Sequence, residues 1–565
     1  MEQRRYQWAA SGDVNAFFGL MLDNIAGLLL LVSLLNIVFG FPVTFSLAYM
    51  VPGTALGVMV GDLLFFWLAF RYAKRSGKTD VTAMPLGLDT PSTIGMIFLV
   101  LGPAYATALQ TEGATPDTAA MAAWKIGMCA IFISGIVKGV LAFFSNWLHR
   151  VFPRAGLLGS LAAIAVVLIA FIQTVDLAVN PIVGFAALAI VLATLIARQE
   201  LPFKVPGALG AVLVGTTLFY LLYGVQEVSQ VQFLPAGENV EAFVWFPTEW
   251  TMALRFEWLN SFGDTLPYLG YIIPFAIATV IGGIDCTESA ASVGDEYNTG
   301  QVIGIEAFAT MLAACFGGVI QTTPYIGHPA YKAMGGRALY TLATALFVGG
   351  AGLIGYFSIL FYVIPKEAVL PILVFIGIEI TAQSYHATPR RHYAALAVAC
   401  FPAIAKVVMI YLGQFSIDMA AQAPNVQDVY LRLSVLAGGF ILTSLIWASA
   451  TAAIIDRKFS VAAIYFAVGG MLTMFGLMHS PLNGDQMFMP WNLFEIEFAL
   501  FNETGNLAVG FQSMAEATFT SAQKSIVIQL AVAYLTMALL MIGLESMLGD
   551  KLTPINSDAE YEKLI

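Results

Sequence analysis

The sequence has little charge and few cysteines. Only 11% of its 565 residues are charged and 59% are hydrophobic, whereas an average globular protein has roughly 25% charged residues. Its four cysteines have neither the spacing of a disulfide framework nor that of a metal site; they are Cys129, Cys286, Cys315 and Cys400. These absences exclude a soluble multi-domain chain and predict a polytopic membrane protein.

Basic patches and catalytic motifs are also missing. The net charge is −11, and no basic patch outside short loops would suit a nucleic acid. HExxH, Gly-x-Ser-x-Gly and phosphate-loop motifs are absent. We therefore expect no enzyme, no cofactor and no metal site. A membrane sensor or scaffold is disfavoured because the chain has no sizeable soluble domain.

Long apolar runs fill most of the chain. We count about sixteen segments, most near the roughly 20 residues that cross a bilayer. Alternate loops are basic, with Arg71, Arg150 and Arg390 as examples, while the intervening loops carry acids such as Glu112 and Asp418. The positive-inside rule then places both termini in the cytoplasm of a cell-membrane protein.

Two polar, proline-containing stretches, 84–92 and 322–330, interrupt this apolar sequence. Irregular backbone at membrane depth must line a protein cavity, and paired breaks mark the binding site of a secondary transporter. They fall in the third and tenth segments, which predicts an all-α fold of seven plus seven inverted spans. Two extra C-terminal spans follow. In such a fold the two half-helix N-termini face each other and attract an anion or a carbonyl-rich ligand.

Candidate site residues lie in these breaks and in the eighth span. In the first break they are Leu88, Asp89 and Thr90. The eighth span carries Asp285 and Glu288, which are three apart and share a helix face. A charge at the bilayer centre costs at least ~2.5 kcal/mol, so we expect these carboxylates to bind substrate or a coupling proton; a structural hydrogen bond is the alternative.

Two further residues are candidates for coupling. His328 directly follows the second break; it is either structural or a proton carrier, since histidine titrates near pH ~6.5. Asp62 lies within the second span, and it could also pair with a deep lysine such as Lys138.

Several runs resemble one transporter family. They are 322–337, with Thr-Thr-Pro-Tyr-Ile and Gly-Gly-Arg; 284–289, Ile-Asp-Cys-Thr-Glu-Ser; 375–377; and 401–412. They are similar to motifs of the nucleobase–ascorbate transporter family (nucleobase:cation symporter family 2), in its hypoxanthine/guanine/adenine permease branch. The resemblance covers roughly residues 10–455.

The resemblance implies a core and a gate domain, usually in a homodimer, moving a nucleobase with protons or sodium ions. The core would be 1–145 and 264–363, the gate 146–224 and 364–455, with an extracytoplasmic loop at 225–263 and extra spans in 456–565. Glu288 and Asp285 would take the acidic positions. Thr323, Pro324 and Tyr325 would form the strand whose backbone meets the substrate.

One departure from the branch leaves the substrate open. The branch has a glutamate after Tyr-Ile, where this chain has Gly327 followed by His328. The main expectation is import of a nucleobase-like molecule by proton or sodium symport. The alternative is an anion transporter of the sulfate-permease class, because two facing helix N-termini with fewer acids suit an anion.

Overall fold

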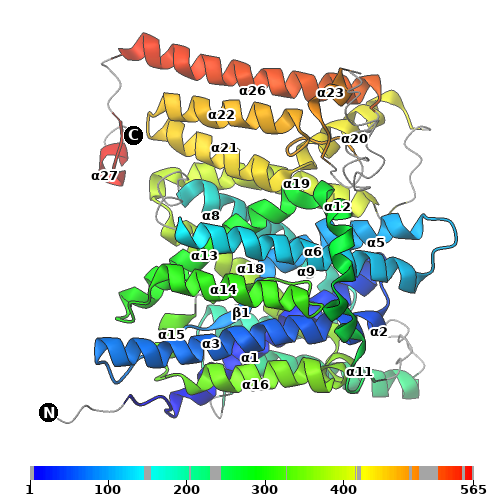
Figure 1. Cartoon of the computed structure of the whole chain (residues 1–565), viewed down its shortest axis with the longest axis vertical. Coiled ribbons are helices and arrows are strands. Elements are labelled where there is room, and N and C mark those ends of the chain that lie inside the picture. Colours follow the sequence, from blue (N-terminus) through cyan, green and yellow to red (C-terminus); the bar gives the residue numbers. More distant parts are fainter. Residues whose placement is uncertain are drawn as a thin grey trace. The chain divides into compact units, whose positions relative to one another are not determined.

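The computed structural model is almost wholly helical (Figure 1). It describes residues 6–144, 154–202, 205–229, 243–325, 327–413, 415, 422–482, 487–494, 519–549 and 554–562. Within these ranges ten helices are long and apolar enough to cross a membrane, or twelve if each of two bent pairs is one span. The chain is therefore a multi-pass membrane protein.

The predicted seven-plus-seven repeat with two broken segments is confirmed. The first seven spans are α1 (Gly12–Phe39), α2–α3 (Val43–Ser76), β1 (Leu86–Leu88) with α4 (Thr90–Gly95) to α5 (Gly102–Leu109), α6 (Pro116–Phe143), α8 (Arg154–Ala163) to α9 (Ile172–Leu177), α10 (Pro181–Val191) and α11 (Gly207–Ser229). The second seven are α13 (Leu269–Ser292), α14 (Thr299–Cys315), β2 (Thr322–Pro324) with α15 (His328–Ala333), α16 (Leu339–Ile354) to α17 (Phe357–Val363), α18 (Lys366–Ala387), α19 (Tyr393–Gly413) and α20 (Pro424–Ala437) to α21 (Phe440–Ile455).

The two broken segments meet strand to strand. β1 pairs with β2 in antiparallel register, with Leu86 opposite Pro324, Gly87 opposite Thr323 and Leu88 opposite Thr322. An antiparallel pair of equivalent strands is related by a two-fold axis, as an inverted repeat requires.

By contacts the chain divides into two units. Unit 1 comprises Met1–Asn146, Gln173–Ser261 and Phe275–Phe375; unit 2 comprises Trp147–Ile172, Phe262–Pro274 and Ile376–Ile565. Both strands and the half-helices α4 and α15 belong to unit 1. The predicted boundary at 145 and 146, and part of the predicted loop 225–263, lie outside the described residues.

Small residues let α3 approach α14 inside unit 1. Gly53, Gly57 and Gly61 recur every four residues and so share one helix face. A Cβ on Gly57 would lie 2.6 Å from the Cβ of Ala313, and one on Gly61 would lie 2.4 Å from a Leu86 methyl. This close packing, which small residues permit in membranes, brings β1 against the second span.

Unit 2 contains the two extra C-terminal spans, α22 (Phe459–Met474) and α26 (Ser521–Leu548), which pack on each other. Beyond α22, His479 lies within hydrogen-bonding distance of the Val435 carbonyl at 2.8 Å and the Tyr534 hydroxyl at 2.7 Å. Tyr534 also accepts a hydrogen bond from Trp447 at 2.6 Å. Because Val435 lies near the 73° bend between α20 and α21, the added α26 is tied to that break.

Candidate functional site

Side chains from the first two spans hold β1 in place. The Asn24 amide donates to the Leu86 carbonyl at 3.3 Å, and its oxygen accepts from the Leu88 amide at 3.1 Å. Asp62 accepts from the Leu86 amide at 3.1 Å. Non-helical backbone at membrane depth needs such partners, and these polar side chains satisfy the outward-facing backbone groups of β1.

A buried ion pair holds β2. Lys138 on α6 donates to the Thr322 carbonyl at 2.9 Å and pairs with Glu306 on α14 at 2.8 Å. Both side chains are 0% exposed. The Thr322 amide donates to the Thr310 hydroxyl at 3.2 Å. Each backbone amide of β2 that faces away from β1 therefore has a partner, except at Pro324, which has no amide hydrogen.

The carboxylates beside the two strands have different partners. Asp62 on the second span and Glu306 on the ninth occupy equivalent elements of the two repeats. Glu306 is paired with Lys138, but one Asp62 oxygen, Oδ2, is buried without a hydrogen-bond partner in the described part of the chain. An unpaired buried carboxylate is costly when ionised, so the β1 side favours an uncharged carboxyl group.

Gly87 and Thr323 lie on one face of the strand pair. They stand opposite each other, and opposite residues of an antiparallel pair point to the same side; we call this side the Gly87 face. A Cβ on Gly87 would lie 3.4 Å from Asp23 Oδ2 and 4.0 Å from the Tyr325 ring. The half-buried Asp23 carboxylate has no hydrogen bond or ion pair within the described residues.

The two half-helices begin differently. Asp89 caps α4 by accepting from the Ser92 amide at 3.0 Å. At α15 the N-cap is Gly327, which has no side chain to cap the helix. The next residue, His328, is 0% exposed. The negative cap thus lies on the first half-helix, whereas the second begins with a histidine.

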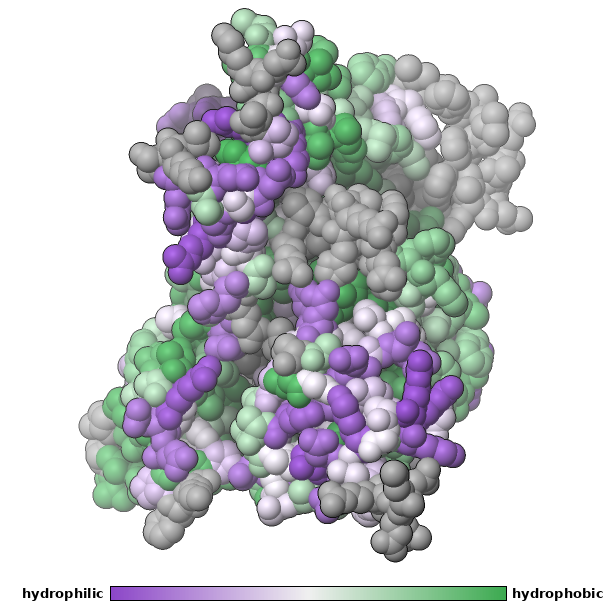
Figure 2. Space-filling model, turned by 90° about the vertical axis from the view of Figure 1, so that its left-hand side faces the viewer, coloured by the Kyte–Doolittle hydropathy of each residue, from purple (hydrophilic) through white to green (hydrophobic). Residues whose placement is uncertain are grey.

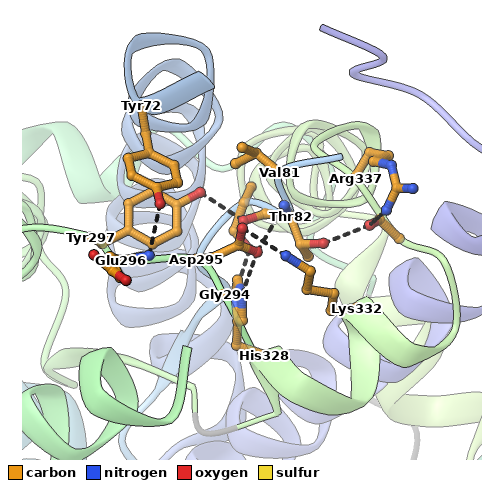
Figure 3. A network of polar contacts seen from close by, with 12 residues as sticks. Tyr72, Val81, Thr82, Gly294, Asp295, Glu296, Tyr297, His328, Lys332 and Arg337 are labelled. Carbon is orange, nitrogen blue, oxygen red and sulfur yellow. Dashed lines mark hydrogen bonds and ion pairs between the residues drawn. The ribbon is translucent and has the colours of Figure 1, made fainter. Parts of the chain in front are cut away.

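Asp295, in the turn between α13 and α14, ties the second half-helix to the segment that enters β1 (Figure 3). Its carboxylate meets His328 Nε2 at 3.0 Å and Lys332 Nζ at 2.7 Å, and accepts from the Thr82 amide at 3.1 Å. His328 Nδ1 faces the Ala83 carbonyl at 3.2 Å. The His328 ring therefore lies between two acceptor groups, the Asp295 carboxylate and the Ala83 carbonyl.

This network also sets the titration of Asp295. Burial alone would raise the pKa of the Asp295 carboxyl, but hydrogen bonds from His328, Lys332 and the Thr82 amide together hold that pKa below its ordinary value. Asp295 is therefore an anion at neutral pH, in contact with the Lys332 ammonium group and the His328 ring of α15.

Most of the sequence-predicted site residues come together in unit 1. Thr323 and Tyr325 are half-buried, whereas Leu88, Thr90 and Pro324 are buried. On α13, Asp285 is half-buried and Glu288 is exposed, and both make further polar contacts. His328 instead bonds to Asp295 and Ala83.

Asp23, Asn24, Glu306 and Asp295 were not among the site residues predicted from the sequence, and Lys138 was predicted only as a possible partner of Asp62. A signal was available for Asp23 and Asn24, since two adjacent polar residues interrupt an otherwise apolar first span. Among the described residues no three histidine, cysteine or acidic side chains cluster as metal ligands would.

No protein-family model matches the chain, and no curated protein matches it. Among solved structures, the transmembrane domain of a cyanobacterium bicarbonate transporter, BicA, is 13% identical over 72% of this chain and 96% of its own, with a TM-score of 0.45. SLC26A9 is 13% identical over 70% of this chain and 65% of its own, at 0.46. The murine Slc26a9 anion transporter in the inward-facing state is 12% identical over 73% and 69%, at 0.38.

These matches contradict the expected membership of the nucleobase–ascorbate transporter family, because they are a bicarbonate transporter and anion transporters. The expectation failed for a physical reason. The motifs at 322–337 and 284–289 encode a strand, a half-helix and an acidic span, which transporters of different substrates share. The chain is a multi-pass membrane protein with the seven-plus-seven inverted-repeat fold.

Proposed function

We propose that this protein is a transporter that carries a small anion together with a proton or another cation, and that both bind at the Gly87 face, beside Thr323. The observation that carries the proposal is the Asp23 carboxylate. It lies next to Gly87 and has no partner among the described residues. Intramembrane acids of this kind are costly and mark ion pathways.

The carboxylate gives a physical reason for coupling. An ionised Asp23 repels an anion at the Gly87 face, since unlike a surface charge it is poorly screened. A proton or cation bound to Asp23 removes that repulsion, so each ligand raises the affinity of the site for the other. Asp62, whose Oδ2 has no partner in the described chain, is the second carboxyl group that we assign to coupling.

The β2 side supports an anion as the substrate. Lys138 and Lys332 match its two carboxylates, Glu306 and Asp295, and the His328 ring lies beside Asp295. The start of α15 adds the positive end of a backbone dipole, which no side chain caps. A half-site without excess negative charge, next to a neutralisable carboxylate, suits a small oxyanion or halide.

Uptake by reconstituted protein tests the proposal. We expect an imposed proton or sodium gradient to drive accumulation of one of bicarbonate, sulfate, chloride or a short dicarboxylate. Asp23→Asn mimics the neutralised carboxyl group, so it should lose gradient-driven accumulation while retaining exchange of labelled for unlabelled anion. Asp80→Asn, an exposed acid in a loop, is the matched control and should behave as wild type.

Two results would overturn the proposal. One is gradient-driven uptake by Asp23→Asn at the wild-type rate, which would show that the Asp23 carboxylate does not couple transport to the gradient. The other is transport of none of the anions by protein that is folded and inserted. Glu288→Gln separates the eighth-span acid from Asp23: if Glu288 is the coupling group, this variant alone loses the gradient dependence.

We also assign the membrane orientation from charge. The exposed Lys74 and Arg75 in the last turn of α3, and Arg457 just after α21, lie at span ends that the positive-inside rule assigns to the cytoplasm. Both termini then lie in the cytoplasm of a cell membrane. A cysteine placed at Ser76 should react with a membrane-impermeant maleimide only after the cytoplasmic face is opened; labelling of intact cells would reverse the orientation.

A further inference from the structure

The last turns of α3 present a basic face beside an exposed tryptophan. Trp67, Arg71, Lys74 and Arg75 are spaced at i, i+4, i+7 and i+8, so they lie along one side of the helix. Trp67 is 53% exposed and all three basic residues are exposed. The Arg71 guanidinium lies 5.3 Å from the centre of the Trp67 ring.

The helix is long enough to place this face at the membrane surface. The continuous helix Val43–Ser76 has 34 residues, which at 1.5 Å per residue is about 51 Å, while the hydrocarbon core is about 30 Å thick. The helix ends at Gly77, whose φ of 71° lies in the left-handed range. The basic turns therefore project into the headgroup region.

A second tryptophan marks the same level. Trp8, before α1, is 41% exposed and packs edge-on against Phe66, with ring centres 6.1 Å apart. Exposed tryptophans concentrate where the hydrocarbon meets the headgroups. Figure 2 looks onto the end of the molecule where α3 finishes and shows hydrophilic residues gathered there beside hydrophobic flanks.

The charge of the basic face is not neutralised by the protein. Within the described residues, Arg71, Lys74 and Arg75 form no ion pair. Lys78 is not part of this face, because its ammonium group donates a hydrogen bond to the Gly294 carbonyl. Exposed acids at this end, such as Asp80, lie outside ion-pair distance of the three bases.

We propose that this face, Trp67, Arg71, Lys74 and Arg75, binds the headgroup of an anionic phospholipid. Arginine pairs with phosphate oxygens in two parallel hydrogen bonds, lysine adds a point charge, and the Trp67 ring lies at the glycerol level. Juxtamembrane basic clusters attract anionic lipid by about 1 kcal/mol per residue. Nothing in this binding depends on which substrate the transporter carries.

The test compares two variants with the same change in charge. Arg71→Gln/Lys74→Gln/Arg75→Gln removes the face, while the control Arg198→Gln/Arg255→Gln/Arg432→Gln removes three exposed arginines elsewhere. Detergent-purified protein is titrated with phosphatidylglycerol or phosphatidylcholine, and retained lipid is counted by native mass spectrometry. We expect wild type and control to retain phosphatidylglycerol, and the face variant to bind it at least about tenfold more weakly, as three lost bases at 1 kcal/mol each allow.

Other outcomes would overturn the proposal. Equal loss in the two triple variants would show a general charge effect without a site. Equal retention of phosphatidylcholine and phosphatidylglycerol would show that binding does not depend on an anionic headgroup. Competition by inorganic phosphate alone, without lipid retention, would identify a free-anion site. Trp67→Leu leaves every charge in place and should weaken phosphatidylglycerol retention by a smaller factor than the triple variant. Unchanged phosphatidylglycerol retention would show that the Trp67 ring does not contribute to the site.

Discussion

Replacing Asp295 by asparagine should destabilise unit 1, because the substitution keeps the shape of the side chain but removes its charge. The carboxylate meets Thr82, His328 and Lys332 at 2.7–3.1 Å and is 0% exposed. Asparagine can still accept from Thr82, but its amide nitrogen is a donor, like the Lys332 ammonium group that it would meet. Removing one partner of a buried charge pair costs about 3–5 kcal/mol, and we expect the lower end because Lys332 is 17% exposed.

The effect should depend on pH in a defined direction. The folded-state pKa of Asp295 lies below its ordinary value because its hydrogen bonds outweigh the effect of burial. A carboxyl group with a lowered folded pKa stabilises the fold above its unfolded pKa, near 3.9, and loses that contribution as the pH falls through the folded value. The difference between wild type and Asp295→Asn should therefore be full at neutral pH and shrink below about pH 4.

Thermal unfolding of the purified protein, measured at neutral and at acid pH, checks this expectation. Glu296→Gln is the matched control, since it removes the same charge from the adjacent, exposed residue and should leave the melting temperature within error. An Asp295→Asn protein as stable as wild type at neutral pH would refute the reasoning. So would a deficit that grows, rather than shrinks, in acid.

Three further changes have expected sizes that thermal or denaturant unfolding can measure. Gly57→Ala should cost about 1–3 kcal/mol, because its Cβ would lie 2.6 Å from a side chain of α14; an unchanged stability would show that the helices can separate without cost. Lys138→Met should cost about 3–5 kcal/mol by leaving Glu306 buried and unpaired, and adding Glu306→Gln should recover most of the loss; no recovery would mean that the lysine acts through Thr322 instead. Asn24→Ala removes two backbone hydrogen bonds of β1 and should cost about 1–3 kcal/mol for each unpaired group, whereas equal stability of variant and wild type would mean that water replaces the amide.

Periodicity and composition were sufficient to predict the fold. Runs of apolar residues of bilayer length predicted the spans, and the prolines at 85, 91, 324 and 329 predicted the breaks, because proline excludes a continuous helix. The antiparallel pairing of β1 with β2 follows from the odd number of spans in each repeat. The division into a core and a gate domain came only from the family resemblance and stays a prediction.

The site was harder to predict, because its polar groups come from distant spans. The ion pair of Lys138 with Glu306 joins the fourth and ninth spans, and only their packing on the two sides of Thr322 reveals it. Likewise, the sequence places His328 at the break, but the direction of its ring depends on Asp295 and Ala83, which approach from other segments. The substrate could not be predicted, because a shared backbone motif was taken as evidence of a shared ligand.

Proline at position 324 has a consequence for how this chain can vary over evolution. Asn24 must supply an acceptor to the Leu88 amide, so the first span is obliged to keep a polar residue there. Pro324, at the equivalent outward edge of β2, has no amide hydrogen to satisfy. The eighth span, which packs there with Gly283 and Cys286, is free of that obligation. Sequences related to this one that keep the proline should therefore hold the first-span asparagine fixed while the facing positions of the eighth span diverge; where the proline is lost, a polar residue should arise on that span.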